Sequence, residues 1–145
     1  MFYKIIWREH SSIYQVFRQY PSVQTDTRKL KQGDIFFALK GPNFNGNGFA
    51  LKALEAGAAY SVVDEDLHTT DSRIIKVADA LVTLQELDKY HREQFNIPFI
   101  CITGSNGKTT SKELMYAVLS SHYKPYTTQG NLNNNIGVPL PFLSV

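Results

Sequence analysis

The residues best suited to chemistry in this sequence lie in a glycine-rich stretch that follows the apolar run 99–103. This stretch contains Gly104, Gly107, Lys108 and Thr109. Glycines let backbone N–H groups point into a loop without clashes from Cβ atoms, and a following helix adds unpaired N–H groups and the positive end of its dipole. The lysine can then reach the β- and γ-phosphates, and the threonine hydroxyl can ligate Mg²⁺. The stretch therefore predicts a site for ATP or GTP.

The spacing of this stretch departs from the usual phosphate-loop pattern. Thr103 or Ile102, depending on how the intervening residues are counted, stands where the first glycine is expected. An alternative interpretation is a glycine and asparagine turn ahead of an ordinary helix. Apolar residues recur with helical spacing after the loop, at Leu114, Met115 and Val118, which favours the order strand, glycine loop, helix.

Length and charge limit the classes of function. The 145 residues suffice for one core, or for one small domain and the beginning of a second. Fifteen basic and thirteen acidic residues leave a net charge of +2 without a block of like charge, so we expect no nucleic-acid partner. Lys4 and Arg8 interrupt the apolar N-terminus. We therefore expect neither a signal peptide nor a membrane span, and a cytoplasmic location.

Cysteine and histidine give no sign of a metal site. The single cysteine, Cys101, excludes an internal disulfide and fits a reducing compartment. Its place in the apolar run predicts a buried small hydrophobe rather than a catalytic thiol. The four histidines are isolated, and no pair has the spacing of zinc ligands.

Apolar periodicity and turn residues predict alternating strands and helices. The expected strands are 2–6, 35–39, 60–63 and 73–77, and the expected helices are 12–20, 49–56 and 79–95. Between them, residues 40–48 form a loop rich in glycine and asparagine, a composition common in binding loops. This alternation predicts an α/β layer fold.

A domain boundary is predicted at residues 96–98. Residues 1–96 would form a complete first domain, and residues 97–145 would begin a second one that is too short to complete a nucleotide-binding sheet. One more strand is expected at 125–128, before the polar loop 129–139. Exposed strand edges in an incomplete sheet would favour self-association.

Three ordered motifs together resemble the Mur ligases of peptidoglycan synthesis. They are Asp26-Thr-Arg28 with Gly33-Asp-Ile-Phe-Phe-Ala-Leu-Lys-Gly41, then Thr103-Gly-Ser-Asn-Gly-Lys-Thr-Thr110 with Lys112-Glu113, then Gly130-Asn-Leu-Asn-Asn-Asn-Ile-Gly-Val-Pro139. The match runs from about Thr25 to the last residue. The third motif is most similar to that of the family member that joins D-alanyl-D-alanine to UDP-N-acetylmuramoyl-tripeptide.

The resemblance implies a small N-terminal α/β domain that holds the UDP part of the substrate, followed by the truncated start of a P-loop, Rossmann-like ATPase domain. It also implies ATP and Mg²⁺, and a monomeric parent protein whose missing C-terminal domain brings D-alanyl-D-alanine. In such ligases the substrate carboxylate attacks the ATP γ-phosphate, and the incoming amine then attacks the acyl phosphate. Charge on the transferred group is what the site must stabilise.

The resemblance also assigns residues. Those matching the ATP loop are Gly104, Ser105, Asn106, Gly107, Lys108, Thr109 and Thr110, with Lys108 and Thr109 catalytic, Lys108 on the phosphates and Thr109 on Mg²⁺. Those matching the UDP-substrate side are Thr27, Arg28, Pro42, Asn43, Phe44, Asn131, Asn133 and Asn134. Simpler roles remain open for some of them. Arg28 would be a solvated charge, Phe44 a core anchor, and the asparagines turn residues.

Two departures from the family pattern limit these expectations. Asn45-Gly46-Asn47 stands where the family commonly has Asp-Gly-His, which puts a histidine role there in doubt. The sequence also lacks the family's second Mg²⁺ carboxylate, its modified lysine and its amino-acid domain, so we expect no ligation by this chain alone. Another Mur-type ligase, a folylpolyglutamate-synthase-type ligase, or a non-catalytic UDP-sugar-binding module remain alternatives.

Overall fold

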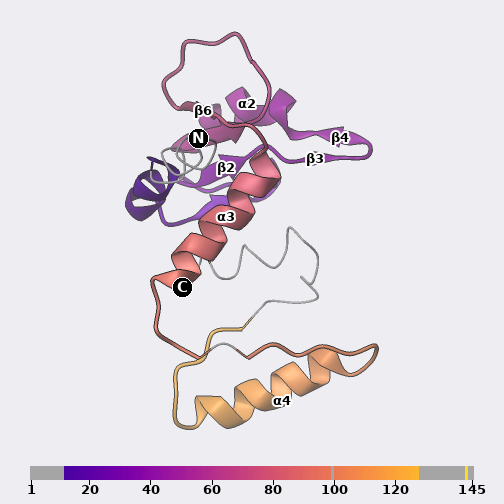
Figure 1. The fold of residues 1–145 in the computed structure, drawn as a ribbon. Coiled ribbons are helices and arrows are strands. Elements are labelled where there is room, and N and C mark those ends of the chain that lie inside the picture. Colours follow the sequence, from indigo (N-terminus) through magenta and orange to yellow (C-terminus); the bar gives the residue numbers. More distant parts are fainter. Residues whose placement is uncertain (1–11, 99, 128–142, 144–145) are drawn as a thin grey trace, which may run out of the picture.

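The first part of the chain is an α/β layer built on a four-stranded parallel sheet (Figure 1). The computed structural model describes residues 12–98, 100–127 and 143, so the predicted strand at 2–6 lies outside the described residues. The strands are β1 (Val23–Gln24), β2 (Ile35–Phe37), β5 (Tyr60–Val63) and β6 (Ile74–Lys76), in the order β1-β2-β5-β6. The predicted fold class is therefore confirmed. Strand β1 was not predicted, because two residues are too few to show a period.

Helices cover both faces of this sheet. Ile35 and Phe37 of β2 pack in one apolar cluster with the helix over 12–19 and with α3 (Ala80–Glu93). Phe36, between them, faces a second cluster with α2 (Ala50–Glu55). Side chains alternate across a strand, and a parallel strand between two helical layers is apolar on both faces. This explains why the apolar run 35–39 is buried throughout.

The three helices of this layer begin and end close to where local signals predict. Asp79 caps α3, its Oδ1 accepting a hydrogen bond of 2.9 Å from the backbone N–H of Val82. Gly57, just after α2, has φ of 111°, the left-handed conformation that favours glycine at a helix end. The helix over 12–19 stops before Pro21. All three predicted helices are thus confirmed.

The predicted loop over 40–48 contains a hairpin. Strands β3 (Lys40–Gly41) and β4 (Phe44–Asn45) pair antiparallel and form a separate two-stranded sheet. In Figure 1 this hairpin projects sideways from the main layer. A short 3-10 helix, η2 (Gly46–Phe49), follows it and leads into α2. A similar 3-10 turn, η1 (Thr27–Lys29), follows β1.

The helix after the glycine loop, α4 (Lys108–Ser120), lies apart from this layer (Figure 1) and buries none of its residues. The predicted strand ahead of it is wrong. Residues 100–103 are not in a strand, Ile100 is 60% exposed, and Cys101 is exposed rather than buried. A buried parallel strand needs hydrogen-bonded neighbours, and the described residues supply none at this position. For the same reason 125–127 form no strand, while 128 lies outside the described residues.

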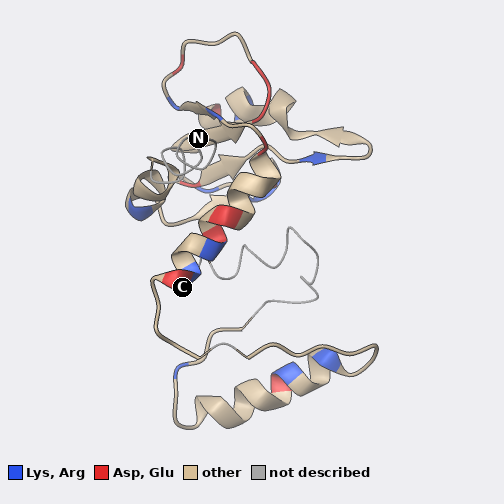
Figure 2. Cartoon of the chain, viewed as in Figure 1, with Lys and Arg blue, Asp and Glu red and all other residues tan. Residues whose placement is uncertain are grey.

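The described residues contain neither a helix that could cross a membrane nor a cluster of metal-binding side chains. No helix there is long and apolar enough to cross a membrane. No three His, Cys, Asp or Glu side chains there gather in a way that could hold a metal ion. Charges of both signs alternate along α3 (Figure 2), as expected for a solvent-exposed helix face.

Candidate functional site

The candidate site lies where two neighbouring parallel strands end. The carboxyl ends of parallel strands share one edge of a sheet, where open α/β sheets bind ligands. After β1 the chain enters the turn 25–29, and shortly after β2 it enters the β3–β4 hairpin. An open pocket of about 480 Å³ lies there, here called the aromatic pocket. Its lining residues are Thr25, Asp26, Thr27, Arg28, Phe36, Phe44 and Phe49.

Short polar side chains shape the turn that carries Thr27 and Arg28. The side-chain oxygen of Gln24 accepts hydrogen bonds from the N–H groups of Thr25 and Asp26, at 3.0 and 3.2 Å. Asp26 then caps η1 by accepting the N–H of Arg28 at 3.1 Å. This is an Asx-type turn, which Asp forms readily because its short side chain reaches a backbone N–H two residues on. The turn thus holds Thr27 and Arg28, both of which line the pocket.

Asp26 also holds the guanidinium of Arg28 through two bonds. Arg28 Nε donates to Asp26 Oδ1 at 2.9 Å, and Nη2 donates to Oδ2 at 2.7 Å. The Arg28 side chain is 86% exposed, so it is solvated as the simpler interpretation expected, but it is not isolated. These hydrogen bonds lower the pKa of Asp26 to about 2 and raise that of Arg28. The pair is therefore ionised throughout the neutral pH range, with a fixed arginine orientation.

Two phenylalanine rings form an aromatic wall of the pocket. Phe44, on β4, stacks on Phe49 with 5.4 Å between ring centroids. Phe44 is 52% exposed and Phe49 36% exposed, so the interpretation of Phe44 as a core anchor is wrong. Lys52 Nζ lies 5.8 Å from the centroid of the Phe49 ring, within the range of a cation–π contact. Exposed rings beside an open pocket are suited to cover a planar base.

Pro42 and Asn43, also predicted on the UDP-substrate side, are not among the residues that line this pocket. Pro42 and Asn43 form the turn between β3 and β4 and are exposed. Asn131, Asn133 and Asn134 lie outside the described residues. Of the predicted set, the structure thus brings Thr27, Arg28 and Phe44 together.

The glycine loop has the backbone shape expected of a phosphate cradle. Gly104 has φ of 151° and Gly107 has φ of 75°, both conformations that favour glycine. Lys108 Nζ folds back and donates a hydrogen bond of 2.6 Å to the carbonyl oxygen of Gly104. The other predicted loop residues, Ser105, Asn106, Thr109 and Thr110, are exposed. The loop therefore presents an accessible surface around one lysine.

The start of α4 fits an anionic phosphate group. Gly107 occupies the N-cap position, and no side chain caps the 13-residue helix. The first N–H groups of a helix are unpaired within it and attract anions. Thr109 lies in the first turn, where its hydroxyl could ligate Mg²⁺.

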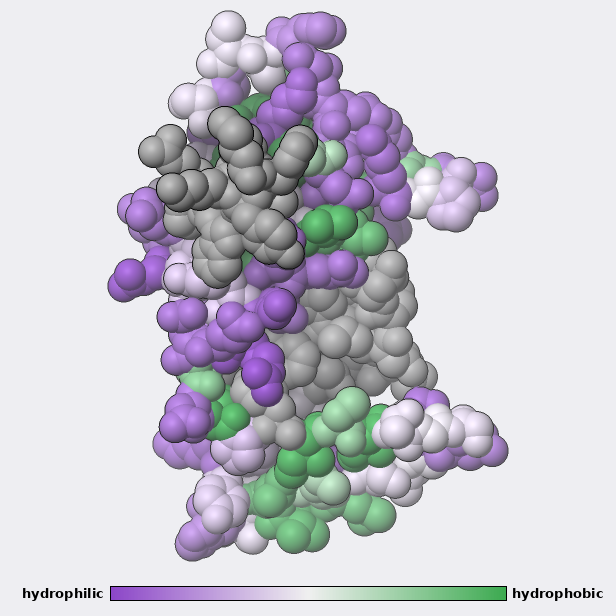
Figure 3. Space-filling view, viewed as in Figure 1, coloured by the Kyte–Doolittle hydropathy of each residue, from purple (hydrophilic) through white to green (hydrophobic). Residues whose placement is uncertain are grey.

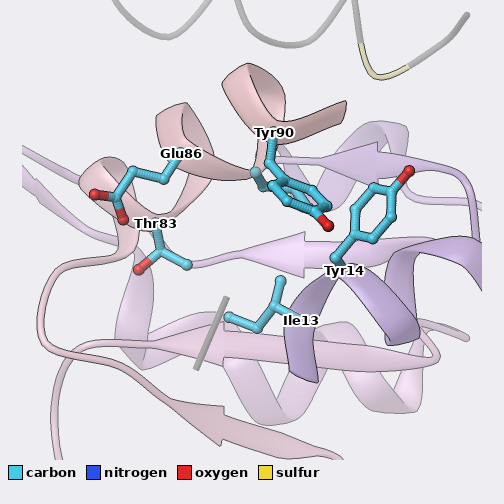
Figure 4. A pocket seen from close by; sticks show the side chains of 6 residues that line it. Ile13, Tyr14, Thr83, Glu86 and Tyr90 are labelled. Carbon is cyan, nitrogen blue, oxygen red and sulfur yellow. The ribbon is translucent and has the colours of Figure 1, made fainter. Parts of the chain in front are cut away.

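A second cavity lies between the helix over 12–19 and α3 (Figure 4). Its volume is about 10 Å³, and it is lined by Ile13, Tyr14, Thr83, Glu86, Leu87 and Tyr90. A space of this size holds about one water molecule. We therefore assign it no ligand.

Sequence reasoning did not single out four lining residues as site residues: Thr25, Asp26, Phe36 and Phe49. Asp26 could have been found, since an aspartate two residues before an arginine can cap a turn and pair with it. Phe49 was predicted only as the start of a helix. Its stacking on Phe44 depends on the hairpin, which leaves no signal in a single sequence.

Comparison with known protein families gives two matches that together span most of the chain. Residues 19–107 match the description "Mur ligase family, catalytic domain". Residues 102–145 match "Mur ligase middle domain".

Individual relatives agree with these matches. The chain is 42% identical over 125 residues to the UDP-N-acetylmuramoyl-tripeptide–D-alanyl-D-alanine ligase of Bacillus subtilis, and 45% identical over 127 residues to that of Synechocystis. These alignments cover 85% and 86% of the chain but only 27% and 28% of the relatives. The chain thus spans little more than a quarter of their length.

Solved structures show the same relation. The MurF ligase of Thermotoga maritima, solved in complex with ADP, superposes with a TM-score of 0.76 at 32% identity, covering 84% of this chain and 28% of that one. A MurF structure from Acinetobacter baumannii superposes with a TM-score of 0.77 at 36% identity, over 86% and 27% of the two chains. The family match over residues 19–107 alone covers more than half of the chain. This chain belongs to the Mur ligase family.

Proposed function

We propose that this chain supplies the UDP-substrate-binding domain and the phosphate loop of an ATP-dependent ligase. The parent protein would join D-alanyl-D-alanine to UDP-N-acetylmuramoyl-tripeptide. The observation that carries the proposal is the convergence of Thr27, Arg28 and Phe44 on the aromatic pocket. Its support is the 41–45% identity to three ligases whose names state this substrate and this product bond.

In this proposal the aromatic pocket binds the uridine end of the substrate. The exposed rings of Phe44 and Phe49 would cover the flat base, a contact that removes apolar surface from water. A guanidinium carries five N–H donors, and Asp26 takes two of them from Arg28. The others sit on a side chain that is 86% exposed and would reach ligand oxygens.

The phosphate loop would bind ATP. When ATP arrives, Lys108 would exchange the Gly104 carbonyl for a phosphate oxygen, since a charged acceptor forms the stronger hydrogen bond. Gly104, Gly107 and the uncapped N–H groups of α4 would surround the β- and γ-phosphates. Bound Mg²⁺ would neutralise phosphate charge, with Thr109 as its ligand from this chain.

The parent reaction would then proceed in two steps. A carboxylate oxygen of the tripeptide attacks the γ-phosphorus of ATP, forming an acyl phosphate as the bond to ADP breaks. The amine of D-alanyl-D-alanine attacks the acyl carbon, the amide bond forms, inorganic phosphate leaves, and the nitrogen gives up a proton. Lys108 and the loop N–H groups would stabilise the negative charge on the transferred phosphoryl group.

The same proposal covers the setting of the parent protein. We infer that the parent enzyme acts as a monomer in the cytoplasm, where ATP and nucleotide-linked precursors are available. The 145-residue chain alone would bind ligands without ligating them, because it covers only 27% and 28% of the length of two such ligases.

The decisive test is calorimetric titration of the chain with UDP-N-acetylmuramoyl-tripeptide and, separately, with ATP and Mg²⁺. We expect Arg28→Ala to lower the affinity for the UDP compound about tenfold, the loss typical of a charge-assisted bond, with ATP affinity unchanged. Lys108→Ala should lower the affinity for ATP and leave the affinity for the UDP compound unchanged. Lys29→Ala, an exposed neighbour outside the pocket lining, is the matched control.

Two outcomes would contradict the proposal. Equal loss of both ligands on Arg28→Ala would mean that the variant damages the fold rather than the pocket. ATP binding without any UDP binding would leave the phosphate loop alone and favour a ligase of another substrate class.

A further inference from the structure

The hairpin that carries Phe44 cannot hold its own position. Its strands, Lys40–Gly41 and Phe44–Asn45, have two residues each and all four residues are exposed. An isolated two-stranded hairpin is at best marginally stable in water. One backbone bond at its base, from Gly46 N to Leu39 O at 2.9 Å, joins it to the segment after β2. The aromatic wall therefore needs a further anchor.

Asp64, the first residue after β5, supplies that anchor. Its Oδ1 accepts hydrogen bonds from Lys40 Nζ at 2.9 Å and from Asn47 Nδ2 at 2.8 Å. Its backbone N–H donates to Asn47 Oδ1 at 3.1 Å. One carboxylate thus holds the first residue of the hairpin and a residue just beyond its last strand, and so fixes both ends.

The bonds to Asn47 lie in a buried environment. Asn47 is 2% exposed, and the Asp64 side chain is 11% exposed. Asn47 Nδ2 also donates to Asn45 Oδ1 at 2.9 Å, so its amide group has partners for its oxygen and for both hydrogens. A buried carboxylate is costly unless it is paired and hydrogen-bonded. The arrangement therefore tolerates little displacement.

A second, more exposed carboxylate bonds to both strands at the base of the hairpin. Glu65 accepts hydrogen bonds from Asn45 Nδ2 at 3.1 and 3.2 Å and pairs with Lys40 Nζ at 3.1 Å. Asp64 Oδ2 also accepts a long bond of 3.4 Å from the N–H of Ala80, at the start of α3. The anchor thus connects the hairpin to β5 and α3, both parts of the main layer.

In the sequence, Asn47 stands between the two phenylalanines whose rings form the aromatic wall. Phe44 is three residues before it and Phe49 two residues after it, and the rings stack at 5.4 Å. Gly46, next to it, packs closely on the backbone, since a Cβ there would lie 2.6 Å from Leu39 O. Movement of Asn47 would therefore shift both rings within the pocket that Arg28 also lines.

We propose that Asp64 is a positioning residue of the aromatic pocket, which sets ligand affinity through Lys40 and Asn47 without touching the ligand. This inference rests on the proposed function, in which the pocket binds a uridine nucleotide. The proposal gives the asparagine at position 47 a specific role in holding the hairpin. Its amide donates to a carboxylate and accepts from a backbone N–H at once.

The test uses UDP as the probe and Asp64→Asn in the 145-residue chain, with Asp66→Asn as the matched control. Asp66 is a nearby exposed carboxylate that pairs with Lys76 at 3.0 Å, away from the hairpin. We expect Asp64→Asn to lower the affinity for UDP about five- to tenfold in calorimetry, as for loss of a largely buried charge-assisted bond. The control should lower this affinity by less than about twofold.

The second measurement needs no ligand. In NMR spectra the ring-to-ring contact between Phe44 and Phe49 should weaken in Asp64→Asn, while amide protection in β2 and β5 stays as in the parent chain. A purely structural role would change sheet protection and not this contact alone. If the parent chain binds no UDP, the proposed function fails, and the ring contact still decides the role of Asp64.

Lys40→Met provides a second variant in case Asp64→Asn does not fold. It removes the ion pair and retains the bonds between Asp64 and Asn47, so a smaller change in the same direction is expected. Unchanged UDP affinity and unchanged ring contact in both variants would overturn the inference. So would an equal loss in Asp66→Asn.

Discussion

At the scale of single residues, short polar side chains hold the backbone around the aromatic pocket. Asp26 bonds to the backbone and side chain of Arg28, and Asn47 bonds to the backbone and side chain of Asp64. Such local bonds compete well with regular secondary structure and so favour turns. Sequence patterns revealed the turn at 26–28 but not the partner of Asn47, because Asp64 is 17 residues away.

Gly46 gives a prediction at this scale. A Cβ at this position would lie 2.6 to 2.8 Å from backbone atoms of Ala38 and Leu39, which cannot move aside as a side chain does. We expect Gly46→Ala to lower the free energy of unfolding by about 2 kcal/mol, the usual cost of overpacking, measured by urea denaturation. Gly48→Ala is the control, since nothing lies within 4 Å of a Cβ there. Equal loss in both variants would contradict this explanation.

At the scale of elements, the contact between the helix over 12–19 and α3 is aromatic. Tyr14 meets Tyr90 edge-on with 4.7 Å between centroids, and His91 lies edge-on to Phe17 at 5.0 Å. Burial lowers the pKa of His91, since the charged imidazolium would lose solvation there. The packing thus favours the neutral imidazole.

The environment of Asp88, on α3, predicts a dependence of stability on pH. Its Oδ1 is buried without a hydrogen-bond partner in the described part of the chain, and burial raises its pKa from 3.8 to about 7, against the opposing charge of Arg92. The folded-state pKa lies above the unfolded value, so the stability present below pH 3.8 is lost as pH rises toward 7.

We therefore expect Asp88→Asn to raise the free energy of unfolding by about 1 to 2 kcal/mol at pH 8, after allowance for partial exposure, and by little at pH 4. Thermal unfolding at pH 4, 6 and 8 measures this. Glu93→Gln, at an exposed position of α3, should leave the pH profile unchanged. A constant offset between Asp88→Asn and the parent chain across this range would contradict the burial argument.

At the scale of the whole molecule, the first part has a core and α4 does not. Leu114 and Val118 are 64% and 70% exposed, and Figure 3 shows apolar side chains gathered over this helix. Most helices in proteins gain their stability from packing of an apolar face rather than from intrinsic propensity. The apolar face of α4 has the composition of a helix that packs on a sheet, and no described strand lies beneath it.

The two long helices allow a matched prediction, because α3 has 14 residues and α4 has 13. An unpacked helix of this length is marginal in water, so we expect α4 amides to exchange with deuterium at least about tenfold faster than those of α3. Hydrogen exchange read by mass spectrometry measures the difference. Equal protection would show that another surface, such as a second copy of the chain, covers α4. That result would support the self-association expected from the sequence.

How far the sequence could predict the structure depended on how local each cause is. The helices at 12–19, 50–55 and 80–93 follow from apolar spacing, caps and turn residues, which act within a few positions. The α/β class follows from their alternation with the buried runs 35–37 and 60–63. The strand predicted before Gly104 failed because an apolar run becomes a strand only when a neighbour pairs with it.

The candidate site divides in the same way. The sequence by itself determined the glycine loop, the Asp-Thr-Arg turn and the family to which they belong, because these motifs depend on residue types at short, fixed spacing. Only the tertiary structure decided that Phe44 stacks on Phe49, that Arg28 lines the same pocket, and that Asp64 bonds to Asn47 and Lys40. Those contacts join residues separated along the chain, and their geometry arises when the strands β1, β2 and β5 align in one sheet and bring their carboxyl ends together.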